Sequence, residues 1–242
     1  MNVLVLGATG ATGRWAVTEL LANGHNVVAL VRDATAMKTL IKPSTQLTII
    51  EKTALTIALK ELTKLVCQSD AIICCLGHTL SWKGIYGAPR MLVKSSLQRV
   101  CECVTPERKT TLRVVLMNST GCRNLDEQEP VSLAQHAVLG LLRLLLPPHV
   151  DNERAGNYLR LLHKRHPELN HLIEWVVVRP DALIDDHQLS EYTLHPSPIR
   201  SALFDSGKTS RINAGHFMAN LVVNDTDWQQ WKGKMPVIYN NG

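Results

Sequence analysis

The amino-acid sequence predicts an α/β fold of the Rossmann type, in which helices cover both faces of a doubly wound parallel sheet. Three observations lead to this prediction. An apolar run at residues 3–6 meets a glycine-rich loop at residues 7–13, and one helical segment later a second apolar run follows at 26–31. Apolar runs then alternate with segments of helical periodicity, and they are continuous, as in parallel strands buried on both faces.

The predicted elements follow one another in a regular order. We expect strands at residues 3–6, 26–31, 47–50, 71–76, 113–118, 175–178 and 236–239. We expect one helix directly after the glycine loop and further helices at 34–41, 54–66, 89–104, 131–146, 152–165 and 212–223. This alternation predicts the strand order 3-2-1-4-5-6, and the segment at 236–239 is expected to add a short seventh strand.

Glycine, proline and capping residues predict where several helices begin and end. Gly24 favours the end of the first helix at about the preceding residue. Pro89 suits the first turn of the long helix before the fifth strand, and the two prolines at 147–148 are expected to end an apolar helix. Asp151 or Asn152 is expected to cap the N-terminus of the helix before the sixth strand.

Length and composition indicate one globular domain over residues 1–242. The chain shows no linker and no repeat, and its 45% hydrophobic and 19% charged residues are ordinary for a globular protein. We expect segments at about 78–90, 122–150 and 181–235 to surround the substrate, because the sheet itself is accounted for by the remaining residues.

Charge and cysteine content narrow the range of partners. The net charge of +5 is dispersed along the chain, which argues against a nucleic-acid partner and fits an anionic small molecule. The six cysteines include no CxxC pair, which argues against a metal site and indicates reduced thiols in a cytoplasmic protein. No signal-peptide pattern is visible, and the most apolar segment, 138–146, is too short to cross a bilayer, so no membrane partner is expected.

The glycine loop predicts a phosphate-binding site. A helix N-terminus offers unpaired N–H groups and a partial positive charge, which a pyrophosphate satisfies when glycines let it approach the backbone. Gly7 is expected to allow the turn after the first strand, Gly10 the close approach, and Gly13 the packing of the helix on the sheet. Thr9 and Thr12 add hydroxyl donors. A plain glycine turn is the alternative interpretation.

Arg32, at the end of the second strand, predicts a preference for NADP over NAD. An acidic residue at this position would bind the 2′-hydroxyl of NAD, whereas arginine suits a 2′-phosphate. Each charge-assisted hydrogen bond contributes about 1.5–3 kcal/mol, which corresponds to roughly tenfold or more in affinity. Arg14 is expected to assist. The acidic Asp33 next to Arg32 weakens the prediction of an NADP preference. The alternative is that Arg32 is only a surface arginine at the start of a helix.

Four sequence segments carry a resemblance to a known family. These are GATGATG after the first strand, VALVRD after the second, the glycine that follows the fourth, and VVVRP at the sixth. Together they resemble an atypical short-chain dehydrogenase/reductase of the NAD(P)H-binding, NmrA-like group, which includes flavin and biliverdin-IXβ reductases. The segment SRINAGHFMANLV resembles a late helix of this family that packs near the substrate.

The resemblance implies roles for individual residues of this chain. It implies that the pyrophosphate is held by Gly7, Thr9, Gly10, Ala11, Thr12 and Gly13. It implies that Arg32 takes the 2′-phosphate and that Thr53 contacts the adenine, although the chain has Glu51-Lys52 where family members often have Gly-Asp. The residues implied for the nicotinamide side are Leu76, Gly77, His78, Ser119, Thr120, Arg179, Pro180 and the segment 181–183.

The chain lacks the Tyr-x-x-x-Lys pair that most short-chain dehydrogenases use for proton transfer. Its tyrosines are Tyr86, Tyr158, Tyr192 and Tyr239. The residues four positions after the first three are Arg90, Leu162 and Pro196. Oxidation of alcohols through that pair is therefore disfavoured. Reduction of a conjugated acceptor needs fewer catalytic residues, because hydride transfer depends mostly on stacking of the acceptor against the nicotinamide.

Three residues are candidates for substrate binding or catalysis. His78 is a candidate proton donor, and Trp82 can stack on a planar substrate. Ser119 is a candidate catalytic or orienting residue at the end of the fifth strand. The alternatives are a histidine bonded to the backbone, a tryptophan that anchors the loop, and a serine that only forms a backbone hydrogen bond.

The sequence therefore favours an NADPH-dependent reductase of a planar or carbonyl acceptor. The alternative is a non-catalytic NADP-binding regulator or redox sensor, because the Tyr and Lys pair is missing. The apolar helix at 131–146 fits burial in the core, a lid over the substrate or the interface of a homodimer. The partner that we expect in each case is a small molecule.

Overall fold

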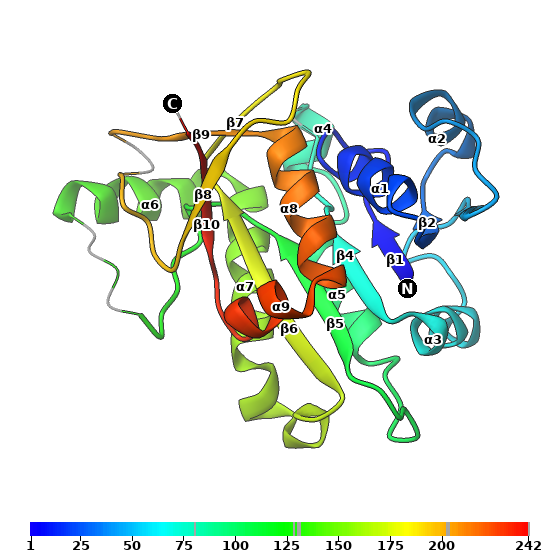
Figure 1. Cartoon of the computed structure of the whole chain (residues 1–242). Coiled ribbons are helices and arrows are strands. Elements are labelled where there is room, and N and C mark those ends of the chain that lie inside the picture. Colours follow the sequence, from blue (N-terminus) through cyan, green and yellow to red (C-terminus); the bar gives the residue numbers. More distant parts are fainter. Residues whose placement is uncertain (80, 128, 130–131, 202–203, 242) are drawn as a thin grey trace.

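The computed structural model describes residues 1–79, 81–127, 129, 132–201 and 204–241. Its main sheet has eight strands in the order β3-β2-β1-β4-β5-β6-β10-β8 (Figure 1). The strands of this sheet are β1 (Asn2–Leu6), β2 (Asn26–Leu30), β3 (Leu47–Ile50), β4 (Ala71–Cys74), β5 (Leu112–Met117), β6 (Ile173–Pro180), β8 (Tyr192–His195) and β10 (Val237–Asn240). Neighbouring strands are parallel except at the edge, where β8 pairs antiparallel with β10. A separate pair joins β7 (Ala182–Ile184) and β9 (Lys208–Ser210).

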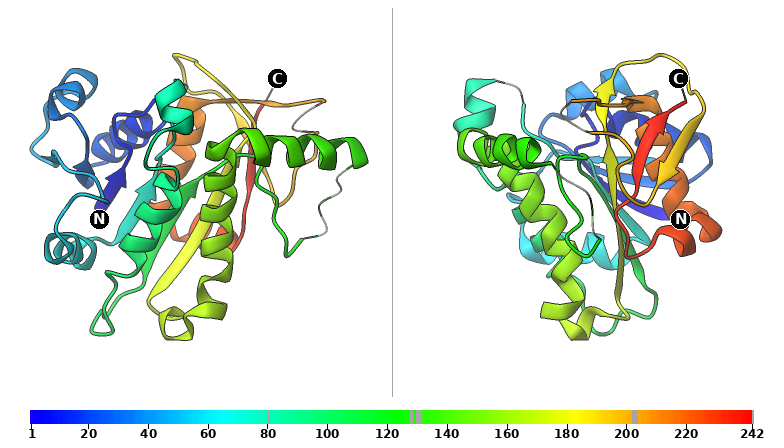
Figure 2. Two further views of the ribbon diagram at one scale, coloured as in Figure 1. Left: turned by 180° about the vertical axis from the view of Figure 1, so that it is seen from behind. Right: turned by 90° about the vertical axis from the view of Figure 1, so that its left-hand side faces the viewer.

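Helices cover both faces of the sheet. The described helices are α1 (Gly13–Ala22), α2 (Ala34–Leu40), α3 (Leu59–Gln68), α4 (Trp82–Tyr86), α5 (Leu92–Cys101), α6 (Leu133–Leu145), α7 (Pro147–Arg165), the 3-10 turn η1 (Pro167–Leu169), α8 (Arg211–Val223) and α9 (Asp225–Trp231). In Figure 1, α1 and α8 lie in front of the sheet, whereas the reverse view in Figure 2 shows α5 and α7 in front. The predicted doubly wound fold is therefore confirmed.

The predicted strand order 3-2-1-4-5-6 is confirmed, and β10 is the expected seventh strand beside β6. Strands β7, β8 and β9 and helices α4 and α9 were not predicted. The prolines at 147–148 begin α7 rather than only ending α6, so the expected N-caps Asp151 and Asn152 lie inside that helix. Pro89 lies before α5, which begins at Leu92. Val131, where the sequence predicts the start of α6, lies outside the described residues.

Two apolar layers hold the sheet between the helices. Successive side chains of a strand point to opposite faces, and β1 sends Val3 and Val5 to one layer and Leu4 and Leu6 to the other. All four are fully or almost fully buried. The first layer contains residues of α1 and α8, and the second contains residues of α3, α5 and α7. This burial explains why the strands read as continuous apolar runs.

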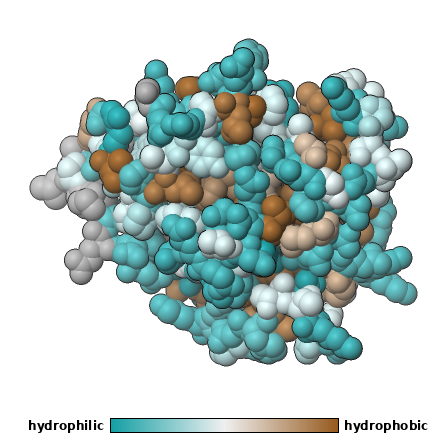
Figure 3. All heavy atoms as spheres, viewed as in Figure 1, coloured by the Kyte–Doolittle hydropathy of each residue, from teal (hydrophilic) through white to brown (hydrophobic). Residues whose placement is uncertain are grey.

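Helix α8 packs closely on α1. A Cβ atom added to Gly215 would lie 2.5 Å from Cβ of Trp15 and 2.8 Å from the backbone nitrogen of Ala16, so only glycine permits this approach. The contact brings the N-terminal half of α8 beside the start of α1. On the face shown in Figure 3, apolar residues form separate groups in a mainly hydrophilic surface. Within the described part of the chain, no helix is long and apolar enough to span a membrane.

Candidate functional site

The glycine loop has the close-packed, glycine-dependent geometry that a phosphate-binding turn requires. Gly7 has φ of +78°, and a Cβ on it would lie 2.6 Å from the carbonyl oxygen of Cys75. A Cβ on Gly13 would lie 2.2 Å from the carbonyl oxygen of Gly7, so the helix begins directly against the turn. The backbone N–H of Gly10 donates to that same carbonyl at 2.9 Å. These contacts fit the roles predicted for Gly7 and Gly13.

The N-terminus of α1 has no side-chain cap, although the N–H groups of Arg14 and Trp15 donate to the carbonyls of Gly10 (3.1 Å) and Thr12 (3.0 Å). Its N-cap, Thr12, makes no side-chain capping hydrogen bond, and the first turn contains no acidic residue. The first N–H groups of a helix have no acceptor within the helix, and they carry part of its positive dipole. An anionic group in front of this turn would satisfy both, which is the arrangement found at nucleotide phosphates.

A cavity of about 600 Å³ lies in front of the glycine loop, and we call it the glycine-loop cavity. It contains ten of the predicted site residues, namely Gly7, Thr9, Gly10, Ala11, Thr12, Arg32, Thr53, Leu76, Gly77 and His78. Arg32 is exposed at its wall, beside the buried Val31. The cavity therefore combines an uncapped helix N-terminus, a cation and apolar walls, which are the groups that a dinucleotide needs.

The other predicted site residues lie elsewhere. Gly13 is buried behind the loop, and the guanidinium carbon of Arg14 lies 5.4 Å from the centre of the Trp15 ring, outside the wall of the glycine-loop cavity. Ser119 and Thr120 line a second cavity instead. The two predicted residues of β6, Arg179 and Pro180, line neither cavity.

Arg179 is part of the core, which corrects its predicted position beside the nicotinamide. Its side chain is fully buried and donates to the backbone carbonyls of Met235 (2.7 Å), Cys122 (3.1 Å) and Pro196 (3.3 Å). Its Nη1 also lies 2.7 Å from Oε1 of the buried Glu129. A buried cation is tolerated when it is paired and hydrogen-bonded, and Arg179 meets both conditions. It joins three segments that surround the second cavity.

His78 lies in the wall of the glycine-loop cavity, but both of its ring nitrogens are occupied. Nδ1 lies 3.0 Å from the carbonyl oxygen of Gly84, and Nε2 lies 2.8 Å from Oδ2 of Asp151. Both ring nitrogens therefore have partners within the protein. The side chain is 5% exposed. This corrects the prediction that His78 donates a proton to the substrate.

Asp151 connects His78 to the start of α5. Its carboxylate is fully buried and accepts hydrogen bonds from the backbone N–H groups of Val93 (2.8 Å) and Lys94 (3.0 Å). Met91, the N-cap of α5, makes no side-chain capping bond, so Asp151 caps this helix from α7. The sequence predicted capping by Asp151, but at the wrong helix.

Trp82 does not contribute to the site as predicted. Its side chain is 81% exposed, its ring centre lies 4.7 Å from that of Tyr86, and it lines neither cavity. The hydroxyl of Tyr86 donates to the carbonyl of Leu145 at 3.0 Å. This bond fastens the α4 segment to the end of α6, so Trp82 and Tyr86 form part of the outer surface.

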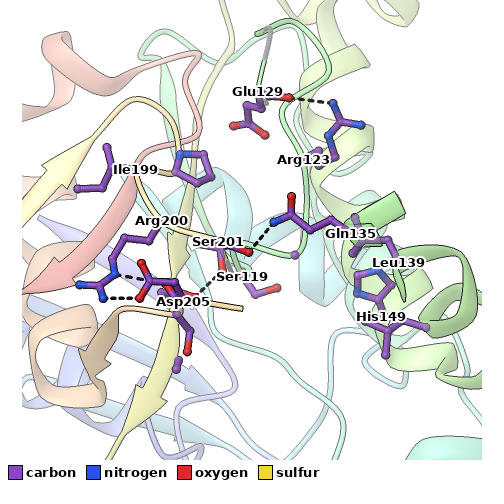
Figure 4. A pocket seen from close by; sticks show the side chains of 17 residues that line it. Ser119, Arg123, Glu129, Gln135, Leu139, His149, Ile199, Arg200, Ser201 and Asp205 are labelled. Carbon is purple, nitrogen blue, oxygen red and sulfur yellow. Dashed lines mark hydrogen bonds and ion pairs between the residues drawn. The ribbon is translucent and has the colours of Figure 1, made fainter. Parts of the chain in front are cut away.

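A second cavity of about 620 Å³ lies at the carboxyl ends of β5 and β6 (Figure 4). In Figure 4, Gln135, Leu139 and His149 line one side and Arg200, Ser201 and Asp205 the other, with Ser119 between them. Other lining residues include Thr120, Gly121, Arg123, Glu129, Leu142, Asp181, Ala182 and Ile199. Residues of both predicted substrate segments after β5 and β6, 122–150 and 181–235, therefore line this cavity.

Residues close together in the sequence line the two cavities at the end of β5 and in β7. Met117 lines the glycine-loop cavity, and Ser119, two residues later, lines the second cavity. In the same way Leu183 lines the first cavity and Ala182 the second. A ligand that fills the glycine-loop cavity towards Met117 and Leu183 would thus lie next to residues whose chain neighbours line the second cavity. Such adjoining sites suit a reaction between two bound molecules.

Polar groups in the second cavity are arranged around Asp181. This buried carboxylate accepts from the hydroxyl of Thr120 at 2.9 Å and from the backbone N–H of Gly207 at 2.8 Å. Across the cavity, the side-chain amide of Gln135 donates to the hydroxyl of Ser201 at 2.7 Å. These bonds fix the walls and leave Ser119 at the centre.

Sequence reasoning missed several lining residues of both cavities. Arg211 lies at the start of α8 in the wall of the glycine-loop cavity, where its Nη1 is 3.1 Å from Oδ1 of Asp185. The resemblance of this helix to a late family helix was the available signal. His149 lies in the second cavity, and its only signal was its place inside the predicted substrate segment 122–150. No group of three or more metal-ligating side chains occurs among the residues described.

The sequence of this chain matches a known protein family. A family model described as NAD(P)H-binding matches residues 7–225, most of the chain. The chain belongs to the NAD(P)H-binding family. This confirms the predicted resemblance to the NAD(P)H-binding short-chain dehydrogenases/reductases. No curated protein matches the sequence.

Solved structures share the fold of this NAD(P)H-binding protein across its length. A short-chain dehydrogenase/reductase from Veillonella parvula in complex with NADP is 15% identical, with a TM-score of 0.68 over 100% of this chain and 95% of that chain. ChuY, an anaerobillin reductase from Escherichia coli, is 16% identical, with a TM-score of 0.66 over 99% and 97%. An oxidoreductase from Lactococcus lactis is 13% identical, with a TM-score of 0.66 over 100% and 91%.

Proposed function

We propose that this protein is an NADPH-dependent reductase of a planar or carbonyl acceptor. The proposal is carried by two cavities whose walls contain residues close together in the sequence, at the end of β5 and in β7. One has the glycine loop and Arg32 in its wall, and the other has Ser119 at its centre. An NAD(P)H-binding protein with a second cavity beside its nucleotide site can hold an acceptor against the nicotinamide.

The chain offers each part of NADPH a suitable group. The uncapped N-terminus of α1 would bind the pyrophosphate, and Arg32 would bind the 2′-phosphate. Thr53 would lie at the adenine, and Gly77 and Met117 would lie towards the nicotinamide. Bound NADPH supplies a hydride, so the protein has only to position the acceptor, exclude water and provide a proton.

The second cavity suits an acceptor that is largely apolar with a few polar atoms. Leu139, Leu142 and Ile199 give it apolar walls, and Ser119 provides a hydroxyl beside the boundary with the glycine-loop cavity. A hydroxyl at this place would orient the oxygen or nitrogen of an acceptor by a hydrogen bond. We assign Ser119 this orienting role.

The structural relatives support the reductase proposal by their own names. One of them is a reductase, and another was solved in complex with NADP. Their identity to this chain is 15–16%, so the proposal depends on the local geometry described above.

The direct test mixes the full-length protein with NADPH and a panel of flavins, quinones, aldehydes and linear tetrapyrroles, and follows the loss of NADPH absorbance. We expect turnover with at least one acceptor class, and slower turnover when NADH replaces NADPH. Ser119→Ala is expected to lower turnover, whereas Ser95→Ala on α5, outside both cavities, serves as the matched control. Binding of NADPH without turnover of any acceptor would exclude the reductase.

A non-catalytic NADP sensor is the second candidate, and the position of Tyr158 favours it. This tyrosine lies on α7, the helix before β6 where the family's catalytic pair would be expected, but it is buried in the core. Burial raises the pKa of its hydroxyl, with the nearby Cys101 adding to the effect, and Leu162 stands where a lysine would be needed. A sensor requires different affinities for NADP and NADPH, so calorimetry with both forms separates the two candidates. Equal affinities would remove the sensor.

A further inference from the structure

His149 occupies a prominent position in the second cavity. It lies in the first turn of α7, directly after two prolines, and its side chain is 13% exposed. Cε1 and Nδ1 of its ring lie 3.3 and 3.7 Å from the point where a Cβ on Gly121 would stand, and Oγ of Ser119 lies 3.4 Å from the same point. His149 Nδ1 and Ser119 Oγ therefore flank one small residue at the cavity wall.

The opposite side of the ring faces a carboxylate. Nε2 of His149 is buried and lies 3.5 Å from Oε1 of Glu153, one helical turn further along α7, without the geometry of a hydrogen bond. No other described residue offers this nitrogen a hydrogen-bond partner. A ring held between a partly buried carboxylate and an open cavity is polarised towards the cavity.

Glu153 keeps its negative charge over the whole neutral range. Burial alone would raise its pKa, but contacts with His149 and Arg143 outweigh burial and lower the pKa to about 2. Arg143 donates to both carboxylate oxygens, at 2.7, 2.8 and 3.1 Å. The carboxylate is thus fixed in place 3.5 Å from Nε2 of His149.

The other charged groups around the cavity are already paired. Glu129 is paired with Arg179, Asp205 with Arg200, and Asp181 accepts two hydrogen bonds. Arg123 donates to the backbone carbonyl of Glu129, and its Nη1 lies 3.4 Å from Nε2 of His136.

Cys122 also lies near Glu153, but burial raises the pKa of its thiol to about 12, so it is neutral. Glu153 and Arg143 are therefore the charges that act most directly on His149.

We propose that His149 is the proton donor for the acceptor in the second cavity, with Glu153 and Arg143 as its positioning residues. The inference rests on the reductase proposed above. Bound NADPH would supply a hydride to one atom of the acceptor and become NADP⁺, and His149 would donate its Nδ1 proton to the neighbouring atom, so that the double bond of the acceptor becomes a single bond. His149 is left neutral with its remaining proton on Nε2 towards Glu153, and solvent then returns the lost proton.

This arrangement replaces the missing tyrosine and lysine by a histidine and a carboxylate. In both arrangements a second charged group lies beside the proton donor and affects how readily the donor gives up its proton. The protonated donor lies beside Ser119, which holds the acceptor atom that receives the proton. The geometry also accounts for Gly121, because any side chain there would lie in contact with both His149 and Ser119.

The test compares the wild-type protein with His149→Gln, Glu153→Gln and His166→Gln in the full chain. His166 lies at the other end of α7 and is exposed, away from both cavities, so its replacement is the matched control. We expect His149→Gln to lower kcat for a carbonyl acceptor by about 10²- to 10⁴-fold, the range typical of general acids. NADPH affinity, measured by calorimetry, is expected to stay within about twofold because His149 is outside the glycine-loop cavity.

The pH profile separates a proton donor from a structural residue. Activity of the wild type is expected to fall as the pH rises, because the donor must be protonated, and this fall is expected to disappear in His149→Gln. In Glu153→Gln the fall is expected to begin at lower pH, since the carboxylate no longer stabilises the charged ring. Added imidazole is expected to restore part of the activity of His149→Ala.

Two outcomes overturn the inference in different ways. Wild-type kcat and an unchanged pH profile in His149→Gln would overturn the role of His149 alone, with the reductase intact. If the wild-type protein binds NADPH but reduces none of the acceptors, the proposed reductase function is wrong. The proton-donor role of His149 is then wrong as well.

Discussion

Oδ2 of Asp151 lies 2.8 Å from Nε2 of His78, and the two residues join three separate segments of the chain. Through His78 the pair holds the carbonyl of Gly84 in α4, and through Asp151 it holds the first turn of α5. The wall of the glycine-loop cavity between β4 and α5 therefore depends on a buried charge pair rather than on apolar packing alone.

Replacement of Asp151 is expected to destabilise the protein strongly. Asp151→Ala leaves a buried imidazole and two N–H groups of α5 without their acceptor, and loss of one partner of a buried ion pair typically costs about 3–5 kcal/mol. The free energy of unfolding in urea measures this change. Asp185→Ala removes an acid whose side chain is 72% exposed in its pair with Arg211, and it is expected to cost at most about 1 kcal/mol. Equal stabilities of the two variants would contradict the assigned role of Asp151.

Arg32→Ala is expected to weaken NADP binding by about 10- to 100-fold, the equivalent of one or two charge-assisted hydrogen bonds. Affinity for NAD is expected to change little, because NAD has no 2′-phosphate. Calorimetric titrations with the two nucleotides check both statements. Lys38→Ala, which removes a cation from the nearby helix α2, is the control. If the ratio of the two affinities stays constant, Arg32 does not select NADP.

Substitutions at two glycines with nearly the same backbone conformation distinguish the effect of backbone strain from the effect of a steric clash. Gly7 and Gly24 have φ of +78° and +76°, but a Cβ on Gly24 would meet no described atom within 4 Å. Gly24→Ala is expected to cost about 1–2 kcal/mol from backbone strain and to retain nucleotide binding. Gly7→Ala is expected to cost more and to abolish NADPH binding, because its Cβ would strike the Cys75 carbonyl. Thermal unfolding and NADPH titration measure both effects, and a Gly7→Ala protein with wild-type affinity would contradict them.

Stability in acid is expected to depend on Glu153. Its pKa is about 2 in the folded protein, against about 4.3 in an unfolded chain, so the unfolded state binds more protons between these values. The stabilisation is therefore complete above about pH 5 and is lost as the pH falls towards 2. Glu153→Gln is expected to flatten this part of the profile of unfolding free energy, whereas Asn152→Ala on the same helix should leave it unchanged. An equal slope in Glu153→Gln would show that the carboxylate is not held as described.

The main sheet could be predicted because its strands are specified by local sequence. The runs at β1, β2, β4 and β5 are apolar at nearly every position, which only a strand covered on both faces requires. Strands β7, β8 and β9 have only three or four residues each, and they range from the apolar Ala182–Ile184 to the polar Lys208–Ser210. Their conformation is set by the neighbouring edges, which no local pattern encodes.

The candidate site also has a part that could be predicted from the sequence and a part that could not. The glycine loop and Arg32 were predictable because one continuous stretch of about thirty residues forms that part of the cavity. His149, Arg211 and the cap formed by Asp151 depend on segments that are distant in sequence. Arg179 was misplaced because a strand-end arginine looks the same whether it faces a ligand or the buried Glu129.

The walls of the two cavities come from different parts of the fold. The glycine-loop cavity is built mainly from strand ends and the start of α1, whereas the second cavity is bounded by α6 and residues 198–201, 205 and 206. Helix α6 packs against α7, outside the sheet. Substitutions in these outer segments can therefore alter the acceptor while the nucleotide half keeps its geometry. Relatives of this chain are expected to diverge in substrate faster than in cofactor, with most insertions and deletions on either side of α6.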